Sequence, residues 1–277
     1  MRRMPAGPRR LAVCLLAIAV LVAAAVPAGA KILKTRTTSE GPAGQELRLN
    51  VGSGFEFETD SEESEYGFPF LAEYGFTENF KLSVEPNYVL IHKKQGGSIN
   101  GPGDLETTLL YEFPTERRYR PGLALQGTVK WPTARRGELG TGQTDYSIGA
   151  IVGKEFVPFD LDLNAIYTFV GDPPGVQLKD TFEASLAAEW HLTEAVDVET
   201  EAVTSFGAAG RFGGRPGSLG SFANIGGPEQ GQSEWETTVG VAEHLNEFLK
   251  VEQGVVYKSS GSWQIVFAWE WDFGGGR

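Results

Sequence analysis

Hydrophobic and polar positions alternate along this chain from residue 46 to its C-terminal end. In the first run Leu47, Leu49 and Val51 share one parity, and charged or polar residues occupy the positions between them. The run from Trp263 to Phe273 repeats the pattern with apolar residues on every second position. Because a β-strand turns successive side chains to opposite faces, each run predicts a strand with one apolar and one polar face.

Twelve such runs follow one another. They lie near 46–58, 65–76, 80–90, 102–113, 122–133, 143–156, 159–170, 180–192, 196–206, 233–243, 248–258 and 263–273. These lengths suit a tilted membrane strand, which needs about 9–11 residues. The alternation is weakest near 248–258, where Gln253 falls on the apolar parity and Val256 on the polar one.

The connections between the runs alternate in length. Those at 77–79, 157–158, 193–195 and 244–247 are very short and 114–121 is longer, whereas the opposite set includes 93–101, 134–142, 171–178 and the Gly-rich 207–231. Outer-membrane barrels have short periplasmic turns and longer outer loops. An even strand number then predicts that both chain ends lie in the periplasm and that 207–231 lies outside.

The apolar parity carries almost no charge, and its exceptions His92, Lys154, Asp180 and Glu243 lie near run ends. A lysine or arginine facing lipid at mid-membrane costs about 2–4 kcal/mol, so this absence indicates a lipid-facing surface. Aromatic residues also recur near run ends, as they do at membrane interfaces. We therefore predict an all-β fold, a transmembrane antiparallel up-and-down β-barrel of about 12 strands, with a soluble all-β protein as the alternative.

The first 30 residues have the order of a cleavable signal peptide: a basic start, an apolar stretch and a small-x-small site ending at Ala30. The expected organisation is a signal peptide at 1–30, a periplasmic segment at 31–43, the barrel at 44–273 and a C-terminal tail at 274–277. We therefore expect export through the Sec pathway to the outer membrane of a Gram-negative bacterium. Cleavage removes Cys14, the only cysteine, so no disulfide or thiolate metal site is expected.

Without residues 1–30 the chain holds 20 basic and 36 acidic residues, a formal charge of −16, which argues against a nucleic-acid partner. The acids favour the polar parity, so the barrel interior is expected to be acidic and an open pore to prefer cations or neutral solutes. In the alternative interpretation these acids sit at the rims or pair with bases and fill the barrel. The lumen-lining candidates are Arg48, Glu73, Glu85, Glu106, Lys130, Glu183, Glu189, Glu199, Glu236 and Glu252.

Lys130 is the one charge in a central and otherwise uncharged run. We expect it to pair with a neighbouring lumen acid on the preceding strand, such as Glu106 or Glu112. The functional alternative is a charge at a channel constriction.

Three segments in the middle of the chain carry a family resemblance. They are Gly103-Asp104-Leu105, the strand Leu125 to Trp131 followed by Pro132-Thr133, and Gly140-Thr141-Gly142-Gln143-Thr144-Asp145-Tyr146. Residues 102–170 thereby resemble an outer-membrane barrel family associated with the meta-pathway of phenol degradation, also described as transporter proteins. Arg135-Arg136 replaces the family's more usual Gly-Asp. The resemblance implies a barrel and uptake of hydrophobic substrates, and it supplies no catalytic mechanism.

Three classes of function remain. The favoured one is a channel for passive passage of small solutes, including hydrophobic or aromatic ones, with outer-membrane lipids and the barrel-assembly machinery as partners. The second is a non-conducting structural or surface-interaction barrel that uses 207–231. The third is an outer-membrane hydrolase around His92, which no Gly-x-Ser-x-Gly motif accompanies. No catalytic residue, cofactor or metal site is predicted, because the histidines show no ligand spacing.

Overall fold

The computed structural model describes residues 48–60, 62–77, 79–113, 118–173, 178–207 and 233–273. Outside them lie the expected signal peptide at 1–30, the segment 31–43, nearly all of the expected loop 207–231 and the tail 274–277. The described strands are β1 (Arg48–Thr59), β2 (Glu63–Gly75), β3 (Phe80–Glu85), β4 (Asn87–Lys93), β5 (Ser98–Pro102), β6 (Leu105–Phe113), β7 (Gly122–Trp131), β8 (Asp145–Phe156), β9 (Phe159–Phe169), β10 (Thr181–His191), β11 (Val196–Gly207), β12 (Glu234–Asn246), β13 (Leu249–Lys258) and β14 (Trp263–Phe273).

Within those ranges, no helix is long and apolar enough to cross a membrane.

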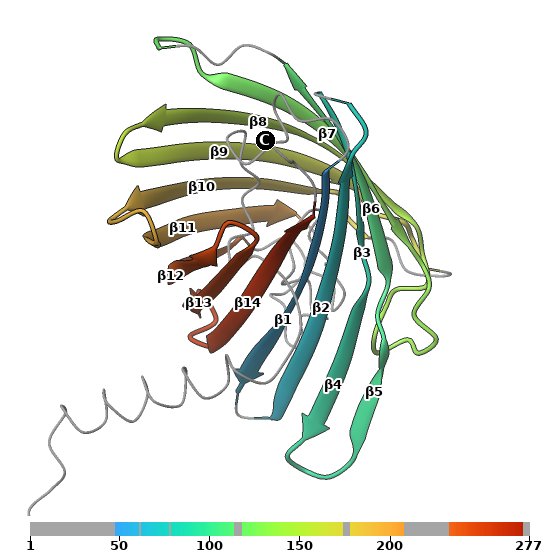
Figure 1. The fold of residues 1–277 in the computed structure, drawn as a ribbon. Helices are drawn as coiled ribbons and strands as arrows, with labels where there is room; N and C mark the ends of the chain where they lie inside the picture. The colour runs from blue at the N-terminus through green and yellow to red at the C-terminus, as the bar shows by residue number, and fades with distance from the viewer. Residues whose placement is uncertain are drawn as a thin grey trace, which may run out of the picture.

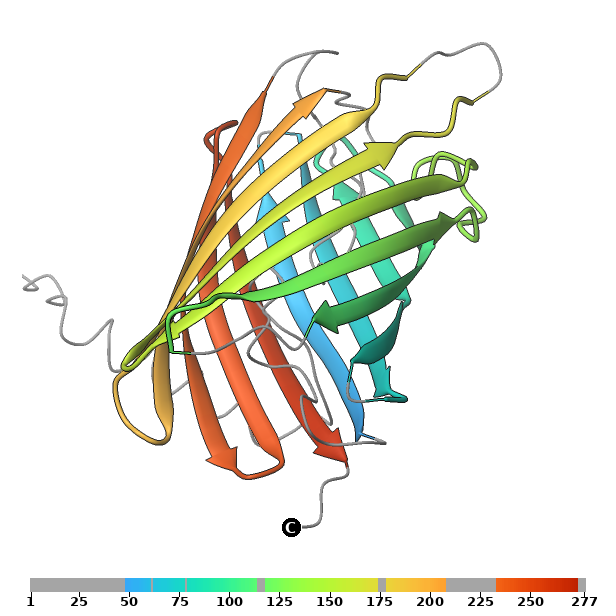
Figure 2. The ribbon, with the colours of Figure 1, turned by 90° about the horizontal axis from the view of Figure 1, so that it is seen from above.

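The strands form one antiparallel sheet that closes on itself (Figures 1 and 2). Apart from β3 and β4, and β5 and β6, consecutive strands pair with each other, and β1 also pairs with β14 in an unbroken register from Leu49↔Phe273 to Thr59↔Trp263. In Figure 1 the blue β1 therefore lies beside the red β14. This closure removes the two edges that an open sheet would expose.

Two of the strands are each interrupted once, so fourteen segments make a closed barrel of twelve strands, as predicted. Pro86, which has no N–H to donate to the ladder, separates β3 from β4, while β2 pairs with both of them. The Pro86 carbonyl still accepts a hydrogen bond of 2.9 Å from the Phe70 amide. Gly103 and Asp104 separate β5 from β6 in the next strand.

The predicted long connection at 93–101 is wrong. β4 and β5 pair from Tyr88↔Pro102 to His92↔Ser98, which leaves only a short turn between them. Gly96 and Gly97 adopt φ values of 101° and 97°, a region that glycine enters without steric cost, and so the chain reverses at once. Alternation alone did not reveal this pairing because Gly101 and Pro102 interrupt the pattern.

We call the end of the barrel where β1 begins and β14 ends the terminal end. Its described connections include the short turns at 157–158, 192–195 and 247–248. The opposite end carries the longer connections 132–144 and 170–180, together with short turns at 60–62, 94–97 and 259–262. The alternation of short and long links is therefore only partial.

Side-chain exposure follows the predicted parity. Along β7 the exposed Leu123 and Leu125 alternate with the buried Ala124 and Gln126. Around the outer wall large apolar side chains are exposed, among them Ile148, Leu163, Leu186, Val239 and Ile265. Soluble proteins rarely expose so continuous an apolar surface, whereas a bilayer requires one, so the molecule is a membrane barrel of the outer-membrane type.

Aromatic rings gather at both ends of this outer wall. At the terminal end Phe159 stacks on Trp190 with ring centroids 5.7 Å apart. At the opposite end Tyr257 contacts Trp263 at 4.6 Å and Trp235 at 5.7 Å. Such belts are typical of the two membrane–water interfaces.

The weakest predicted run keeps its register in the structure. β13 pairs continuously with β14 from Leu249↔Trp271 to Tyr257↔Trp263. Val256 is buried on the inner wall against Val266 and Ala268 and is 1 % exposed, as its parity predicted.

Replacing Leu163, in the middle of β9, with arginine should lower the free energy of unfolding by about 2–4 kcal/mol, because a cation would face hydrocarbon. Leu192→Arg is the matched control, since Leu192 is similarly exposed but lies at the terminal end, where the cost is about 0–1 kcal/mol. Urea unfolding in lipid vesicles measures both values. Equal losses would contradict a lipid-facing β9.

Candidate functional site: the charged interior of the barrel

The polar parity of the described strands faces the inside of the barrel, and nine of the ten predicted lumen-lining residues lie there. Six of them are more than nine-tenths buried: Glu85, Glu106, Lys130, Glu199, Glu236 and Glu252. Glu73, Glu183 and Glu189 share that inner parity and are partly buried. The side chain of Arg48 lies outside the described part of the chain.

Carboxylic acids greatly outnumber bases on this inner wall. Among the described residues fourteen buried side chains are Asp or Glu, and only Lys81 and Lys130 are buried cations. Lys250 and Lys258 add two partly buried cations. Water is largely excluded from these groups, so their charges are weakly screened and each lysine position matters.

Three of the lysines, Lys81, Lys130 and Lys250, each lie between two carboxylates. Lys81 Nζ lies 3.5 Å from Glu73 and 3.2 Å from Glu112, joining β3 to the strands on either side. Lys250 Nζ lies 2.7 Å from Glu252 and 4.0 Å from Glu199.

Lys258 on β13 forms a further ion pair, of 2.5 Å, with Glu58 on β1. Because β14 lies between these two strands, the pair crosses the line where the barrel closes.

Lys130 forms its ion pairs with Asp145 on β8 and, at 3.9 Å, with Asp104. The expected pairing with Glu112 is wrong, because Glu112 binds Lys81. Glu106 lies directly opposite Lys130 in the ladder, yet the ion pairs of Lys130 are with the two aspartates at the end of β7. A long lysine side chain can reach along its strand to acids that do not lie directly opposite it. Cross-strand register alone does not predict such ion pairs.

Lys130 and its partner Asp104 also hold the connection between β7 and β8 against the inside of the barrel mouth. Lys130 Nζ donates to Thr141 Oγ1 at 3.3 Å, and the Ala134 amide donates to Asp104 at 3.0 Å. Leu139 from the same connection is buried against Val89 and Ile91 on the inner face of β4. The connection therefore folds back onto the wall.

Gly140 makes this close approach possible. A Cβ atom at this position would lie 2.6 Å from a carboxylate oxygen of Asp104. The glycine and aspartate of the motifs quoted above thus meet in space.

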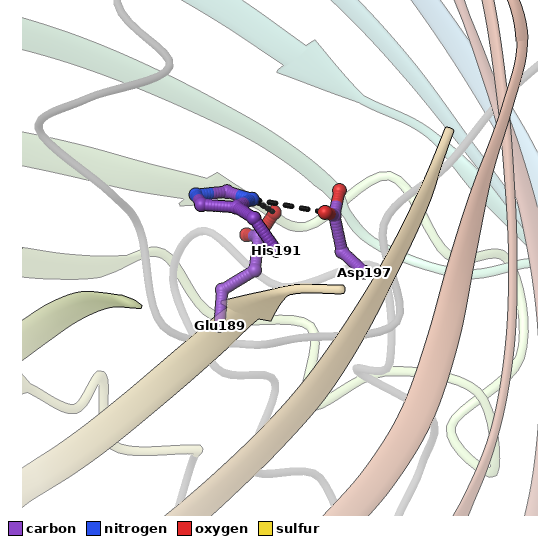
Figure 3. A group of neighbouring side chains, drawn as sticks. All are labelled: Glu189, His191 and Asp197. Atoms are coloured by element: carbon purple, nitrogen blue, oxygen red, sulfur yellow. Dashed lines mark hydrogen bonds and ion pairs between the residues drawn. The ribbon is translucent and has the colours of Figure 1, made fainter. Parts of the chain in front are cut away.

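A second polar group lies at the terminal end, and no sequence spacing predicted it (Figure 3). His191 at the end of β10 bonds through Nδ1 to Asp197 at 2.9 Å and through Nε2 to Asp160 at 3.0 Å. His244 Nε2 contacts the other oxygen of Asp197 at 2.8 Å. The group combines side chains from β9, β10, β11 and β12, so only the three-dimensional pairing brings it together.

Besides Val89, Ile91 and Leu139, apolar side chains interrupt the charged wall at two further places. Leu110, Ala124 and Ile151 form one buried cluster across β6, β7 and β8. Ala187, Val256, Val266 and Ala268 form the other, with Leu71 packed against it. The inner wall therefore carries apolar clusters next to its carboxylates.

Comparison with known proteins gives a family and a fold. Residues 32–227 match the sequence profile of a family described as "Putative MetA-pathway of phenol degradation". Curated proteins include no significant match.

Two solved structures share the barrel. An outer membrane channel from Pseudomonas putida F1 aligns with a TM-score of 0.66 at 10 % identity, covering 86 % of this chain and 99 % of that one. The NanC porin aligns with a TM-score of 0.52 at 10 % identity, covering 80 % and 98 %. At this identity the likeness concerns the fold.

Replacing Lys130 with methionine should lower the free energy of unfolding by about 3–5 kcal/mol, because Asp104 and Asp145 would keep their charges without a counter-ion. Lys93→Met removes an exposed lysine at the end of β4 and is the control, with a change within about 0.5 kcal/mol. Urea unfolding in vesicles measures both. A Lys130→Met variant as stable as Lys93→Met would refute a structural role for these pairs.

Proposed function

The chain belongs to the family described as "Putative MetA-pathway of phenol degradation", and from this membership we propose that it is an outer-membrane channel for the passive passage of small solutes. The observation that carries the proposal is the closed barrel itself, apolar outside and lined inside by carboxylates. The two solved relatives by fold are themselves a channel and a porin.

The predicted lumen residues are proposed to line the path of the solute. An excess of acids in a confined, low-dielectric space raises the local concentration of cations and repels anions. The lysines sit between carboxylates, and so they offset only part of the negative potential. Cations and neutral molecules should therefore pass more readily than anions of equal size.

We propose further that the solutes include hydrophobic or aromatic molecules. This proposal is supported by the two apolar clusters on the inner wall, which would contact an uncharged ring, and by the family description. Outer-membrane lipids around the apolar wall and the barrel-assembly machinery acting on the aromatic β14 are the proposed partners. In this proposal the terminal end faces the periplasm.

A hydrolase is the rival class, and one contact favours it. His92 Nδ1 lies 2.9 Å from Ser98 Oγ across the β4–β5 hairpin. In the described chain, however, no carboxylate orients the second ring nitrogen of His92, as a catalytic triad would require. Ester hydrolysis that disappears in His92→Ala would support the hydrolase, and we propose that the protein is not an enzyme.

Replacing Glu201 and Glu236 together by glutamine should lower the preference of the channel for cations over anions, because two buried inner-wall charges are lost without a change in size. Glu194→Gln with Glu247→Gln removes two exposed acids at the terminal end and is the matched control. The reversal potential across planar bilayers in a KCl gradient reports the preference. An unchanged potential in the inner-wall variant would contradict the proposed solute path, and a wild-type barrel that conducts no ions would favour the non-conducting alternative.

A further inference from the structure

Glu189, His191 and Asp197 come together on the inner wall at the terminal end of the barrel, and their side chains converge from β10 and β11 (Figure 3). We propose that these three residues bind a divalent transition-metal ion of the Zn²⁺ class. The site is separate from Lys130 and its partners, which lie at the opposite end of the barrel.

The spacing of the donor atoms fits such an ion. His191 Nδ1 lies 2.9 Å from Asp197 Oδ1 and 3.7 Å from Glu189 Oε1, and one donor atom from each residue lies within 4.8 Å of the others. Zinc bonds of about 2.0–2.2 Å place tetrahedral ligand atoms about 3.3–3.5 Å apart. Small movements of the side chains would therefore bring all three donors to one ion.

Neighbouring residues already hold two of the three ligands in the required orientation. Asp160 accepts from His191 Nε2 at 3.0 Å, which directs the other ring nitrogen toward Asp197 and Glu189. His244 Nε2 contacts the second oxygen of Asp197 at 2.8 Å and fixes that carboxylate. A carboxylate on the far nitrogen of an imidazole is the usual support of a histidine that binds metal.

The local charge also favours a cation. Glu189 lies opposite Asp160 in one ladder and opposite Glu199 in the other, so carboxylates crowd this part of the wall. Lys250 on β13 is already bound between Glu199 and Glu252. A divalent ion between Glu189 and Asp197 would offset their mutual repulsion.

The donor set selects the class of metal. Imidazole nitrogen is a good ligand for Zn²⁺ and its neighbours in the transition series, whereas Ca²⁺ and Mg²⁺ take oxygen ligands. Three protein ligands would leave a position open toward the lumen, where water or a solute could bind. Sequence spacing did not predict the site because its ligands and their supports come from four strands.

The test uses the whole exported chain without an oligohistidine tag, refolded in detergent, stripped with EDTA and titrated with Zn²⁺ by calorimetry, with bound metal counted by mass spectrometry. Wild-type protein should bind one Zn²⁺ ion, and His191→Ala should lose it. Asp160→Asn should keep the three ligands and weaken binding about 10–100-fold, because only the orienting contact is lost. An excess of Ca²⁺ should not compete.

His92→Ala is the matched control, since it removes a histidine at the other end of the barrel and should bind Zn²⁺ as the wild type does. A gel-mobility shift on heating checks that each variant is folded, and Asp197→Asn replaces His191→Ala if that variant does not fold. The proposal is overturned if the wild type binds no Zn²⁺, or if the ligand variant and His92→Ala bind it equally. Neither result depends on conductance, so the channel proposal would stand or fall separately.

Discussion

In hydrocarbon every backbone N–H and C=O group must find its hydrogen-bond partner within the protein, because lipid offers none. A sheet meets this demand only by closing, and the unbroken β1–β14 ladder is where this chain does so. Closure fixes an inside and an outside, and the two-residue period of the strands then assigns each side chain to one of them. The exposed Leu163 and the buried Asp162 and Asn164 beside it are one local result of that assignment. The aromatic belts and the charged interior follow from the same geometry.

Charge is the second constraint, and it determines how the side chains inside the barrel are arranged. Many carboxylates are buried on the inner wall, and three of the lysines are placed where each can serve two of them, as Lys81 does for Glu73 and Glu112. At the mouth, Lys130 links two strands to a connection that folds inward, so that one charge organises both the wall and the opening. At the terminal end, imidazoles take the place of lysines between the carboxylates, and a bound metal ion could add to them there. The net negative potential that remains is the physical basis of the proposed preference for cations and neutral solutes.

Much of this architecture could be predicted from the sequence. Strand number and facing follow from parity, even in β13, where Val256 replaces a polar residue on the inner wall without a change of register. Parity does not specify which inward residues meet, because that depends on strand stagger and side-chain reach. The two acids named for Lys130, Glu106 and Glu112, were accordingly wrong, although Asp104 from the same run does pair with it. The convergence of His191, Asp197 and His244 was missed. The β4–β5 hairpin was also missed, since Gly101 and Pro102 break the alternation at the end of β5.

The most direct test of the closed outer-membrane barrel is gel mobility with and without boiling, combined with membrane fractionation of cells that express the chain. A closed barrel resists detergent until it is heated, so the unboiled protein should migrate faster than the boiled protein, and both should come from the outer-membrane fraction. Recovery in the soluble periplasmic fraction, with the same mobility before and after boiling, would contradict the account.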